Sequence, residues 1–316
     1  MEKVNDFRQQ LISIIIPTFN RAHLLGETLD SVLAQTYTNW ECLVTDDGST
    51  DTTVNIIAAY AKKDSRIKLL KRPDTKLKGA NACRNMGLDA AQGDYVVFFD
   101  SDDLMTKNHL EVKVKGMNAF NCDYVITKTQ FFNHTNEGIN TYYKFDEFPI
   151  TPFNYVTQKI NWLTYDICLK AKLAKAISFN ENLQSGQEYN YFSKLVHIAT
   201  EGNFIDEVVT LRRHHEHSIR GQLKDRHSLN VSLFKTYFYT YIDLKLISDK
   251  EILFYLMCNC IKLIYDLKGI PIKKRGVFTM EVFKTYSFKG VYFIGMLVGL
   301  KIFNKGYGFR QKLLKA

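Results

Sequence analysis

The sequence predicts an α/β fold in which a mostly parallel sheet is flanked by helices and followed by a helical C-terminal region. In the first hundred residues, short runs of β-branched and aromatic residues alternate with segments of helical periodicity. Strands and helices that alternate at this spacing build parallel sheets with helices on both faces. From Asp225 to the end the pattern is helical, with a break at Gly269-Ile270-Pro271.

Four strands and three helices are expected in the first hundred residues. The first strand, Leu11–Pro17 (LISIIIP), is a β-branched run of the kind that is buried on both faces of a sheet. A helix is expected at Ala22–Gln35, because Leu25, Leu29 and Val32 share one face. The alternation continues with strands at Trp40–Asp46, Ile67–Lys71 and Tyr95–Phe99 and helices at Thr50–Lys62 and Ala80–Ala91.

The alternation weakens beyond about residue 120. A strand is expected at Asp123–Phe132, followed by a polar turn at Asn133–Asn140. The segment Asn161–Leu173 is mixed, Glu188–Ala199 is helical and Asn203–His214 is extended. The sequence therefore specifies the first half of the sheet more strongly than the second.

Composition excludes several classes of protein. The chain has 316 residues, of which 46% are hydrophobic and 24% charged, so wholesale disorder is excluded. No secretory signal and no run of about 18 apolar residues is visible, so neither export nor a transmembrane helix is expected. The six cysteines are scattered without CxxC spacing, which is typical of reduced cytosolic thiols.

Positive charge is concentrated in the last third of the chain. Residues 221–316 carry a net charge of +11 and 17 of the 42 aromatic residues, whereas the remaining 220 residues carry −2. A basic, aromatic-rich helical region indicates contact with an anionic surface, either a membrane or a nucleic acid. The alternative is a solvated basic face whose apolar side packs on the body.

Polar residues follow the first two strands, at the edge where open α/β sheets bind nucleotides. The first strand ends in Pro17-Thr18-Phe19-Asn20-Arg21 and leads directly into a helix. The second ends in Asp46-Asp47-Gly48-Ser49-Thr50-Asp51. Ser49 or Thr50 would cap the next helix, and capping does not also require Asp46 and Asp47. We therefore expect at least one of these two acids to face a ligand.

The fourth strand runs directly into Asp100-Ser101-Asp102-Asp103. Three carboxylates in four residues repel one another and raise their own pKa values unless a cation lies among them. Oxygen ligands in a small cluster suit Mg²⁺ or Mn²⁺ shared with phosphate oxygens. A solvated acidic turn is the competing interpretation for such a motif taken alone.

Taken together, these motifs carry a resemblance. PTFNR, DDGSTD, Gly79-Ala80-Asn81-Ala82-Cys83-Arg84-Asn85 and FFDSDD occur in this order, each at a sheet edge or a helix start. The combination resembles the family 2 glycosyltransferases of the GT-A fold, strongly over residues 11–120 and more loosely to about 220. The resemblance implies a glycosyltransferase domain over residues 1–220, with a nucleotide half of about 1–105 and an acceptor half of about 106–220. Residues 221–316 would form the basic helical C-terminal region.

The resemblance also implies roles for single residues. Asp47 would accept from a uracil-type base, with support from Asp46, and Asp100 would hold the ribose or donor sugar. Asp102 would bind the Mn²⁺ or Mg²⁺ ion that bridges the two phosphates, as in a DxD motif, with Asp103 assisting. The implied nucleotide-sugar site consists of Pro17, Thr18, Asn20, Arg21, Asp46, Asp47, Arg84, Asp100, Ser101, Arg213 and Ser218.

An inverting transfer needs a base that removes the proton of the acceptor hydroxyl. The family usually places a Glu-Asp pair at the start of a helix near residue 190, where this chain has Gln187-Glu188. Glu188 is our candidate base and Glu181 the alternative; Glu188 could instead serve only the helix dipole. Arg212-Arg213-His214-His215-Glu216-His217-Ser218 resembles the family's R-x-H-x-x-S element, which would place His215 beside the metal.

The implied activity is an inverting, metal-dependent hexosyl or N-acetylhexosaminyl transfer from a UDP-sugar to a glycan or lipid-linked glycan hydroxyl. Residues 270–316 would contact an anionic membrane peripherally, on the cytoplasmic side, and no nucleic-acid partner is expected. Bacterial polysaccharide biosynthesis is the usual role of such proteins. The alternatives are a sugar-1-phosphate nucleotidyltransferase, for which the basic Gly-rich loop after the first strand is missing, and a non-catalytic membrane- or nucleic-acid-binding protein, which leaves the acids unexplained.

Overall fold

The computed structural model describes residues 10–214 and 225–315. The chain divides into two compact units: residues 1–181 with 195–215, and residues 182–194 with 216–316. The second unit thus includes residues 182–194, which the sequence analysis assigned to the first domain. The reason is local packing, since Asn190 Nδ2 donates to Thr240 Oγ1 at 3.2 Å and to Asp243 Oδ2 at 2.8 Å.

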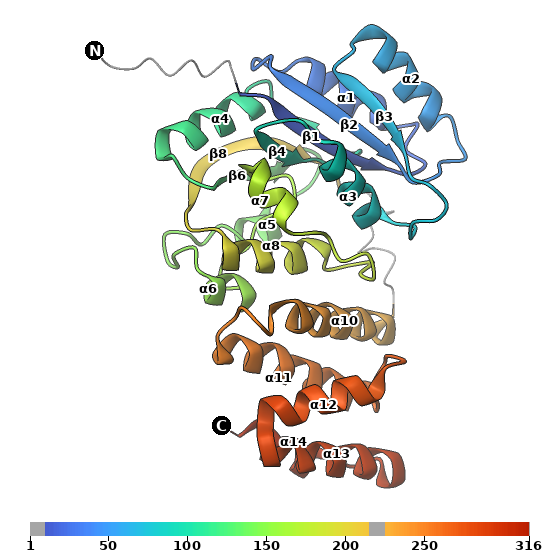
Figure 1. Cartoon of the computed structure of the whole chain (residues 1–316), viewed down its shortest axis with the longest axis vertical. Coiled ribbons are helices and arrows are strands. Elements are labelled where there is room, and N and C mark those ends of the chain that lie inside the picture. The colour runs from blue at the N-terminus through green and yellow to red at the C-terminus, as the bar shows by residue number, and fades with distance from the viewer. Residues whose placement is uncertain (1–9, 215–224, 316) are drawn as a thin grey trace. The chain divides into compact units, whose positions relative to one another are not determined.

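The first unit is built on an eight-stranded mixed sheet with the order β3-β2-β1-β4-β7-β6-β8-β5 (Figure 1). The four strands at one end, β3, β2, β1 and β4, are parallel neighbours. β7 is antiparallel to β4 and β6, β8 is parallel to β6, and β5 is antiparallel to β8. The strands are β1 (Ile12–Thr18), β2 (Trp40–Asp46), β3 (Ile67–Lys71), β4 (Tyr95–Phe98), β5 (Leu104–Met105), β6 (Tyr124–Phe131), β7 (Ile167–Lys170) and β8 (Gly202–Arg212).

Helices cover both faces of this sheet. α3 contacts β1, β2 and α7, and Figure 1 shows α3 and α7 on the same face. α1 contacts α2, which packs on β3, and α4 packs on β6, β7 and β8. The helices are α1 (Leu25–Leu33), α2 (Thr53–Lys63), α3 (Ala80–Ala90), α4 (His109–Phe120), α5 (Glu137–Asn140), α6 (Pro152–Val156), α7 (Ala171–Ala176) and α8 (Gln187–Ile198), whose first part belongs to the second unit.

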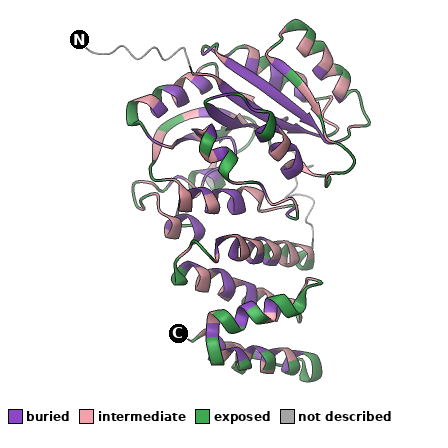
Figure 2. Ribbon diagram, in the orientation of Figure 1, coloured by how far each residue is buried: buried purple, intermediate pink, exposed green. Residues whose placement is uncertain are grey.

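The core lies along the central strands. Every residue of β1, β2 and β4 is buried, as the purple strands in Figure 2 show. Continuous burial on both faces is the reason that these strands read as unbroken apolar runs. Gly87 brings α3 close to β1, because a Cβ at that position would lie 2.3 Å from Ile15 Cγ2.

The expected elements of the first hundred residues are confirmed, with differences at the helix starts. The second and third strands have the expected bounds, the first is shifted by one residue at both ends, and the fourth ends one residue earlier. α1 begins at Leu25 rather than Ala22, because residues 22–24 form a turn that closes with Leu25 N donating to Arg21 O at 2.9 Å. The polar turn expected at Asn133–Asn140 ends in the short helix α5.

The second unit is helical. Its helices are α10 (Arg226–Leu244), α11 (Lys250–Leu267), α12 (Arg275–Tyr286), η1 (Ser287–Lys289), α13 (Gly290–Phe303) and α14 (Tyr307–Leu314). The break expected at Gly269-Ile270-Pro271 lies between α11 and α12. The sequence analysis missed the break before Lys250, where Asp249 occupies the N-cap position of α11.

By length and composition, Arg275–Phe303 is a candidate membrane span, the only one found in the described part of the chain. The segment bends, however, at Ser287, whose φ is +51°. The rings of Phe278 and Phe293 lie 5.7 Å apart, and a Cβ on Gly290 would lie 2.6 Å from the ring of Phe283. Residues 15 positions apart cannot meet along one straight helix. α12 and α13 therefore form a helical hairpin rather than a single span.

Candidate active site

The loops that follow β1 and β2 are linked to each other by hydrogen bonds. Asn20, in the left-handed conformation with φ +50°, donates from its backbone to Ser49 Oγ at 2.9 Å. Its side-chain oxygen accepts from Thr50 N at 2.8 Å, and Arg21 N donates to Thr53 Oγ1 at 2.9 Å. Pro17 and Thr18 end β1 in parallel register with β2. The PTFNR and DDGSTD motifs thus form one connected edge of the sheet.

The two acids at the end of β2 have different surroundings. Asp46 accepts from the backbone N–H groups of Gly48 and Ser49, both at 3.1 Å, and so fixes the turn after β2. Asp47 instead forms an ion pair with Arg72, and each side chain is only 8% exposed. The expectation that at least one of these two acids faces a ligand stays a prediction. Asp47 is the one available to pair with a charged or polar group.

Arg72 is a site residue that the sequence analysis missed. It follows β3 directly, and it also donates from Nη1 to the carbonyl oxygens of Pro73 and Lys76 at 3.0 and 2.7 Å. Arg72 therefore holds Asp47 and the loop after β3 together. Its position in the sequence could have indicated it, because Arg72 follows the end of the third strand directly, as the other motifs follow the ends of theirs.

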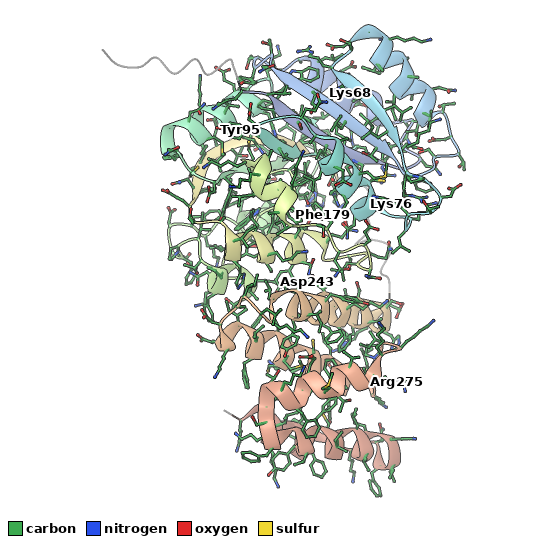
Figure 3. All side chains as sticks on the ribbon, viewed as in Figure 1. Lys68, Lys76, Tyr95, Phe179, Asp243 and Arg275 are labelled. Atoms are coloured by element: carbon green, nitrogen blue, oxygen red, sulfur yellow. The ribbon has the colours of Figure 1, made fainter. Side chains whose placement is uncertain are left out.

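Arg84 and Asp100 meet beneath this edge. Arg84, from α3, pairs with Asp100 Oδ1 at 2.9 Å, and the Arg84 side chain is 7% exposed. Its guanidinium lies 5.4 Å from the ring centroid of Phe179, which packs edge-on against Phe98. Phe179 is labelled in Figure 3. The next residue, Asn85, donates to Glu181 Oε1 at 2.9 Å. The GANACRN segment thus joins the end of β4 to residues 179–181, all within the first unit.

The acidic motif after β4 has three distinct environments. Asp102 Oδ2 lies 3.3 Å from Arg21 Nε and remains 16% exposed. Ser101 is buried. Asp103 is buried as well, and its Oδ1 accepts from Arg213 N at 2.8 Å. Burial, and then the charges of Asp102 and Asp100, raise the pKa of the Asp103 carboxyl well above its ordinary range. Asp100 and Asp102 thus carry ion-paired, partly exposed carboxylates, whereas the carboxyl of Asp103 is buried.

Arg213, which follows β8 directly, contacts two segments that are distant in the sequence. Its Nε donates to the backbone oxygen of Asp102 at 3.1 Å, and its Nη2 donates to Glu27 Oε2 at 2.7 Å. The resemblance implied a position near a diphosphate; in the structure Arg213 contacts the DSDD turn itself and so orders it. His215 and Ser218, the other two residues of that element, lie outside the described residues.

No group of three His, Cys, Asp or Glu side chains within residues 10–214 and 225–315 could hold a metal ion by itself. Mg²⁺ is, however, commonly bound through one or two carboxylates together with substrate phosphates and water. Asp102 fits that pattern, since its carboxylate is partly exposed and lies beside the positively charged side chain of Arg21. The donor chemistry therefore suits an ion that arrives with a diphosphate.

Glu188, the candidate base, belongs to the second unit. It lies half-buried in the first turn of α8. The residue before α8, Gly186, has φ +67°, and a Cβ there would lie 2.4 Å from Thr236 Oγ1. A glycine is therefore required for the chain to enter α8 beside α10, and this fixes where Glu188 begins the helix. Glu181, the alternative base, belongs to the first unit.

Comparison with known proteins shows what the chain is similar to. The model of glycosyl transferase family 2 matches residues 13–182. The curated protein WfgD of Escherichia coli, a UDP-Glc:alpha-D-GlcNAc-diphosphoundecaprenol beta-1,3-glucosyltransferase, is 39% identical over 126 residues, which cover 40% of this chain and 48% of WfgD. The chain spans less than half the length of curated relatives such as this one.

Two solved structures resemble both units of the chain. Residues 1–349 of Staphylococcus aureus TarS, in complex with UDP-GlcNAc, give a TM-score of 0.66 at 17% identity, covering 96% of this chain and 90% of that one. The mannosyltransferase PcManGT from Pyrobaculum calidifontis, in complex with GDP-Man and Mn²⁺, gives 0.58 at 16% identity, covering 96% and 84%. Similarity at such low identity establishes the fold, and it confirms the expected α/β sheet with a helical C-terminal region.

Proposed function

The chain belongs to glycosyl transferase family 2, and we propose that it transfers a hexosyl or N-acetylhexosaminyl group from a UDP-sugar to a hydroxyl of a glycan or lipid-linked glycan. The main support is the edge of the sheet where the loops after β1, β2 and β4 present Asp47, Arg21 and Asp102. These residues lie in the segment that matches the family. UDP is favoured as the nucleotide because WfgD uses a UDP-sugar and TarS binds one.

The nucleotide would bind along this edge. Asp47 would accept from the imide N–H of uracil, with its carboxylate oriented by Arg72. Asp100 would accept from hydroxyls of the ribose or donor sugar, and Arg84 would hold that carboxylate in place through their ion pair. The remaining residues proposed to line the site are Pro17, Thr18, Asn20, Asp46, Ser101, Arg213 and Ser218.

A divalent ion, Mn²⁺ or Mg²⁺, would be held by Asp102 with help from His215, and it would neutralise the charge that develops on the leaving diphosphate. Asp103 is a positioning residue in this account rather than a ligand, since it accepts from the backbone of Arg213. Arg21 would contact the phosphates beside Asp102, because the two side chains already form an ion pair. The protein thus supplies cations where negative charge accumulates.

Glu188 would act as the base. A carboxylate that removes the acceptor proton as the hydroxyl attacks in line gives inversion at the anomeric carbon. The proton moves from the hydroxyl to the carboxylate, the new glycosidic bond forms, and the bond to the diphosphate breaks. Glu181 is the alternative base. Its carboxylate is engaged by Asn85, which favours a structural role for it.

The reaction belongs to polysaccharide biosynthesis in this proposal, on the cytoplasmic side of the membrane. Peripheral contact through residues 270–316 would bring the enzyme to a lipid-linked acceptor. No nucleic acid is needed as a partner, and the acids at the sheet edge would repel one.

A screen of nucleotide-sugar hydrolysis tests the proposal. The purified chain is incubated with UDP- and GDP-sugars and either Mn²⁺, Mg²⁺ or chelator, and release of the nucleoside diphosphate is measured. Metal-dependent release from a UDP-sugar, lost in Asp102→Ala, supports the proposal. Release of pyrophosphate from a nucleoside triphosphate and a sugar phosphate would instead identify a nucleotidyltransferase.

A further inference from the structure

Helix α13 is apolar on two opposite faces. One face, with Phe293, Met296 and Leu300, is buried against the rest of the second unit. The other carries a stripe of exposed residues spaced by three, four and four positions, which places them on one side of the helix. This stripe consists of Val291, Ile294, Val298 and Ile302, between 40% and 64% exposed. A helix that is apolar all round is normally covered on every side.

The exposed apolar surface continues over the rest of the helical hairpin. Val277, Met280 and Phe283 are exposed on α12, and Phe288, in η1 at the bend, is 78% exposed. Figure 2 shows the green exposed segments of α12 and α13 that result. Scattered single apolar residues on a surface are ordinary, but these eight exposed apolar residues on one helical hairpin indicate an interaction site.

The charges around this surface define the partner. Residues 270–316 contain ten Lys and Arg residues and one acid, Glu281. That acid is buried, and its Oε1 lies 3.0 Å from both Lys245 Nζ and Lys284 Nζ, so it offers no negative charge to the surface. A second copy of the chain on this face would bring two basic surfaces together. An apolar surface edged by cations matches the headgroups and upper acyl region of an anionic lipid layer.

The length of the elements favours binding in the plane of the membrane. α13 has 14 residues, which corresponds to about 21 Å, whereas the hydrocarbon core of a bilayer is about 30 Å thick. The hairpin bend at Ser287 prevents α12 and α13 from adding their lengths. A helix that is too short to span, with one apolar face packed on the protein and the other exposed, can insert its exposed face into the interface.

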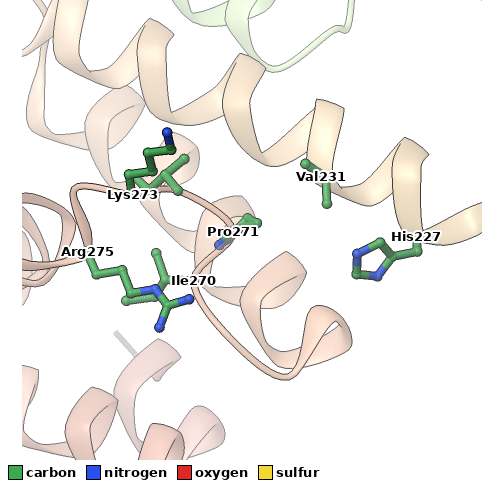
Figure 4. A pocket seen from close by; sticks show the side chains of 7 residues that line it. His227, Val231, Ile270, Pro271, Lys273 and Arg275 are labelled. Atoms are coloured by element: carbon green, nitrogen blue, oxygen red, sulfur yellow. The ribbon is translucent and has the colours of Figure 1, made fainter.

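An open pocket lies at the N-terminal end of α12, away from the bend (Figure 4). Three basic side chains line it: His227 from α10, Lys273 from the segment before α12 and Arg275 at the first position of α12. Its apolar lining comes from Val231, Ile270, Pro271 and Ile272. Cationic groups around an apolar floor suit the phosphate of a lipid headgroup, and a helix lying in the interface brings both of its ends to headgroup level.

We propose that the helical hairpin of α12 and α13, with Phe288 and the stripe inserted, docks in the plane of an anionic phospholipid membrane. Lys273 and Arg275 contact the phosphates at the other end of α12. This inference deepens the peripheral membrane contact proposed above and rests on that contact alone. It does not depend on the proposed sugar transfer, because none of these residues belongs to the first unit, where the nucleotide is proposed to bind.

The test is co-flotation of the full chain with vesicles of phosphatidylcholine, with and without phosphatidylglycerol, at low and high salt. We expect binding to the anionic vesicles that weakens with salt. The double variant Phe288→Gln/Ile302→Gln should weaken it roughly tenfold or more, because two inserted apolar side chains are lost. Leu246→Gln is the matched control, since Leu246 is 90% exposed in the same unit but outside the hairpin, and it should bind as the unchanged protein does.

The charge contribution is tested separately with Lys273→Glu/Arg275→Glu. This variant should lose at least roughly tenfold in affinity for anionic vesicles, because each cation near the surface contributes about fivefold and each is reversed. Lys250→Glu, at the start of α11, is its control. Circular dichroism and thermal melting of every variant verify folding, and UDP binding reports separately on the transfer function.

Three outcomes would overturn the inference. They are absence of binding to anionic vesicles, equal loss in Leu246→Gln and in the hairpin double variant, and concentration-dependent dimerisation abolished by Phe288→Gln/Ile302→Gln without any lipid effect. The last result would identify a second copy of the chain as the occupant of this surface.

Discussion

Arg72 and Asp47 form a buried ion pair between the ends of β3 and β2, and each side chain is 8% exposed. The same guanidinium donates to the carbonyl oxygens of Pro73 and Lys76. Asp47 is therefore held in one orientation by Arg72. In our account this orientation is what allows Asp47 to recognise the base of the donor.

Replacing Arg72 with alanine should destabilise the protein by about 3–5 kcal/mol, because it leaves a buried carboxylate without its cation. Affinity for UDP should fall as well. Lys115→Ala is the control, since it removes an exposed pair with Glu111 within α4 and should cost about 0.5 kcal/mol or less. Urea denaturation and calorimetric titration with UDP measure both effects. Equal destabilisation by the two variants would contradict the structural role of Arg72.

Glu188→Gln should reduce turnover roughly 10²-fold or more while donor binding stays nearly unchanged, because the amide cannot accept the acceptor proton. Glu181→Gln should have a smaller effect on turnover, since Gln can still accept from Asn85. Initial rates at saturating UDP-sugar and acceptor compare the two variants. If Glu181→Gln is the more damaged enzyme, the base is Glu181.

The stability of the protein should depend on pH through the buried carboxyl of Asp166. It is fully buried and accepts from Tyr143 Oη at 2.8 Å and Leu163 N at 2.7 Å. Burial raises the pKa of its carboxyl to about 6. Since the folded state holds this proton more tightly than the unfolded state, the stabilisation is present below about pH 4 and is lost as pH rises through 6.

The measurement is the free energy of unfolding of the unchanged protein and of Asp166→Asn between pH 4 and 7. Their difference should shift by roughly 3 kcal/mol over this range, in favour of the variant at higher pH. A constant difference across the range would show that Asp166 does not titrate with a raised pKa.

Gly186→Ala should destabilise the second unit. The substitution places a Cβ 2.4 Å from Thr236 Oγ1 and forces alanine into a conformation with φ +67°. We expect a loss of about 1–3 kcal/mol. Gly308→Ala, in α14, is the control: a Cβ there meets nothing within 4 Å, and alanine should be neutral or stabilising. Thermal melts compare the two, and equal melting temperatures would contradict the packing of α8 on α10.

Much of the first unit could be predicted because its central strands are continuous apolar runs that end at acids. Trp40–Asp46 is such a run, and its bounds are as expected. The start of α1 could not be predicted, because the residues at 22–24, which form a turn, are types that also occur within helices. Nor could the membership of residues 182–194 in the second unit, which depends on contacts such as that between Asn190 and Asp243, 53 residues apart.

The site was predictable in part for a related reason. Strand ends identify which residues share an edge, so Asp47, Asp100 and Asp102 were found from local sequence. Pairings between distant segments could not be found in this way, since Arg213 and Glu27 are 186 positions apart in the sequence. The pairing of Arg72 with Asp47 was within reach, because parallel register places Lys71 beside Asp46 once β2 and β3 are neighbours.

The most direct test of the central claim is calorimetric titration of the full chain with UDP, in the presence and absence of Mn²⁺, beside the same titration of Asp102→Ala. We predict UDP binding that Mn²⁺ strengthens, and no effect of Mn²⁺ in the variant. UDP binding that is absent, or that responds to Mn²⁺ equally in both proteins, would contradict the assignment of this sheet edge as a metal-assisted diphosphate site.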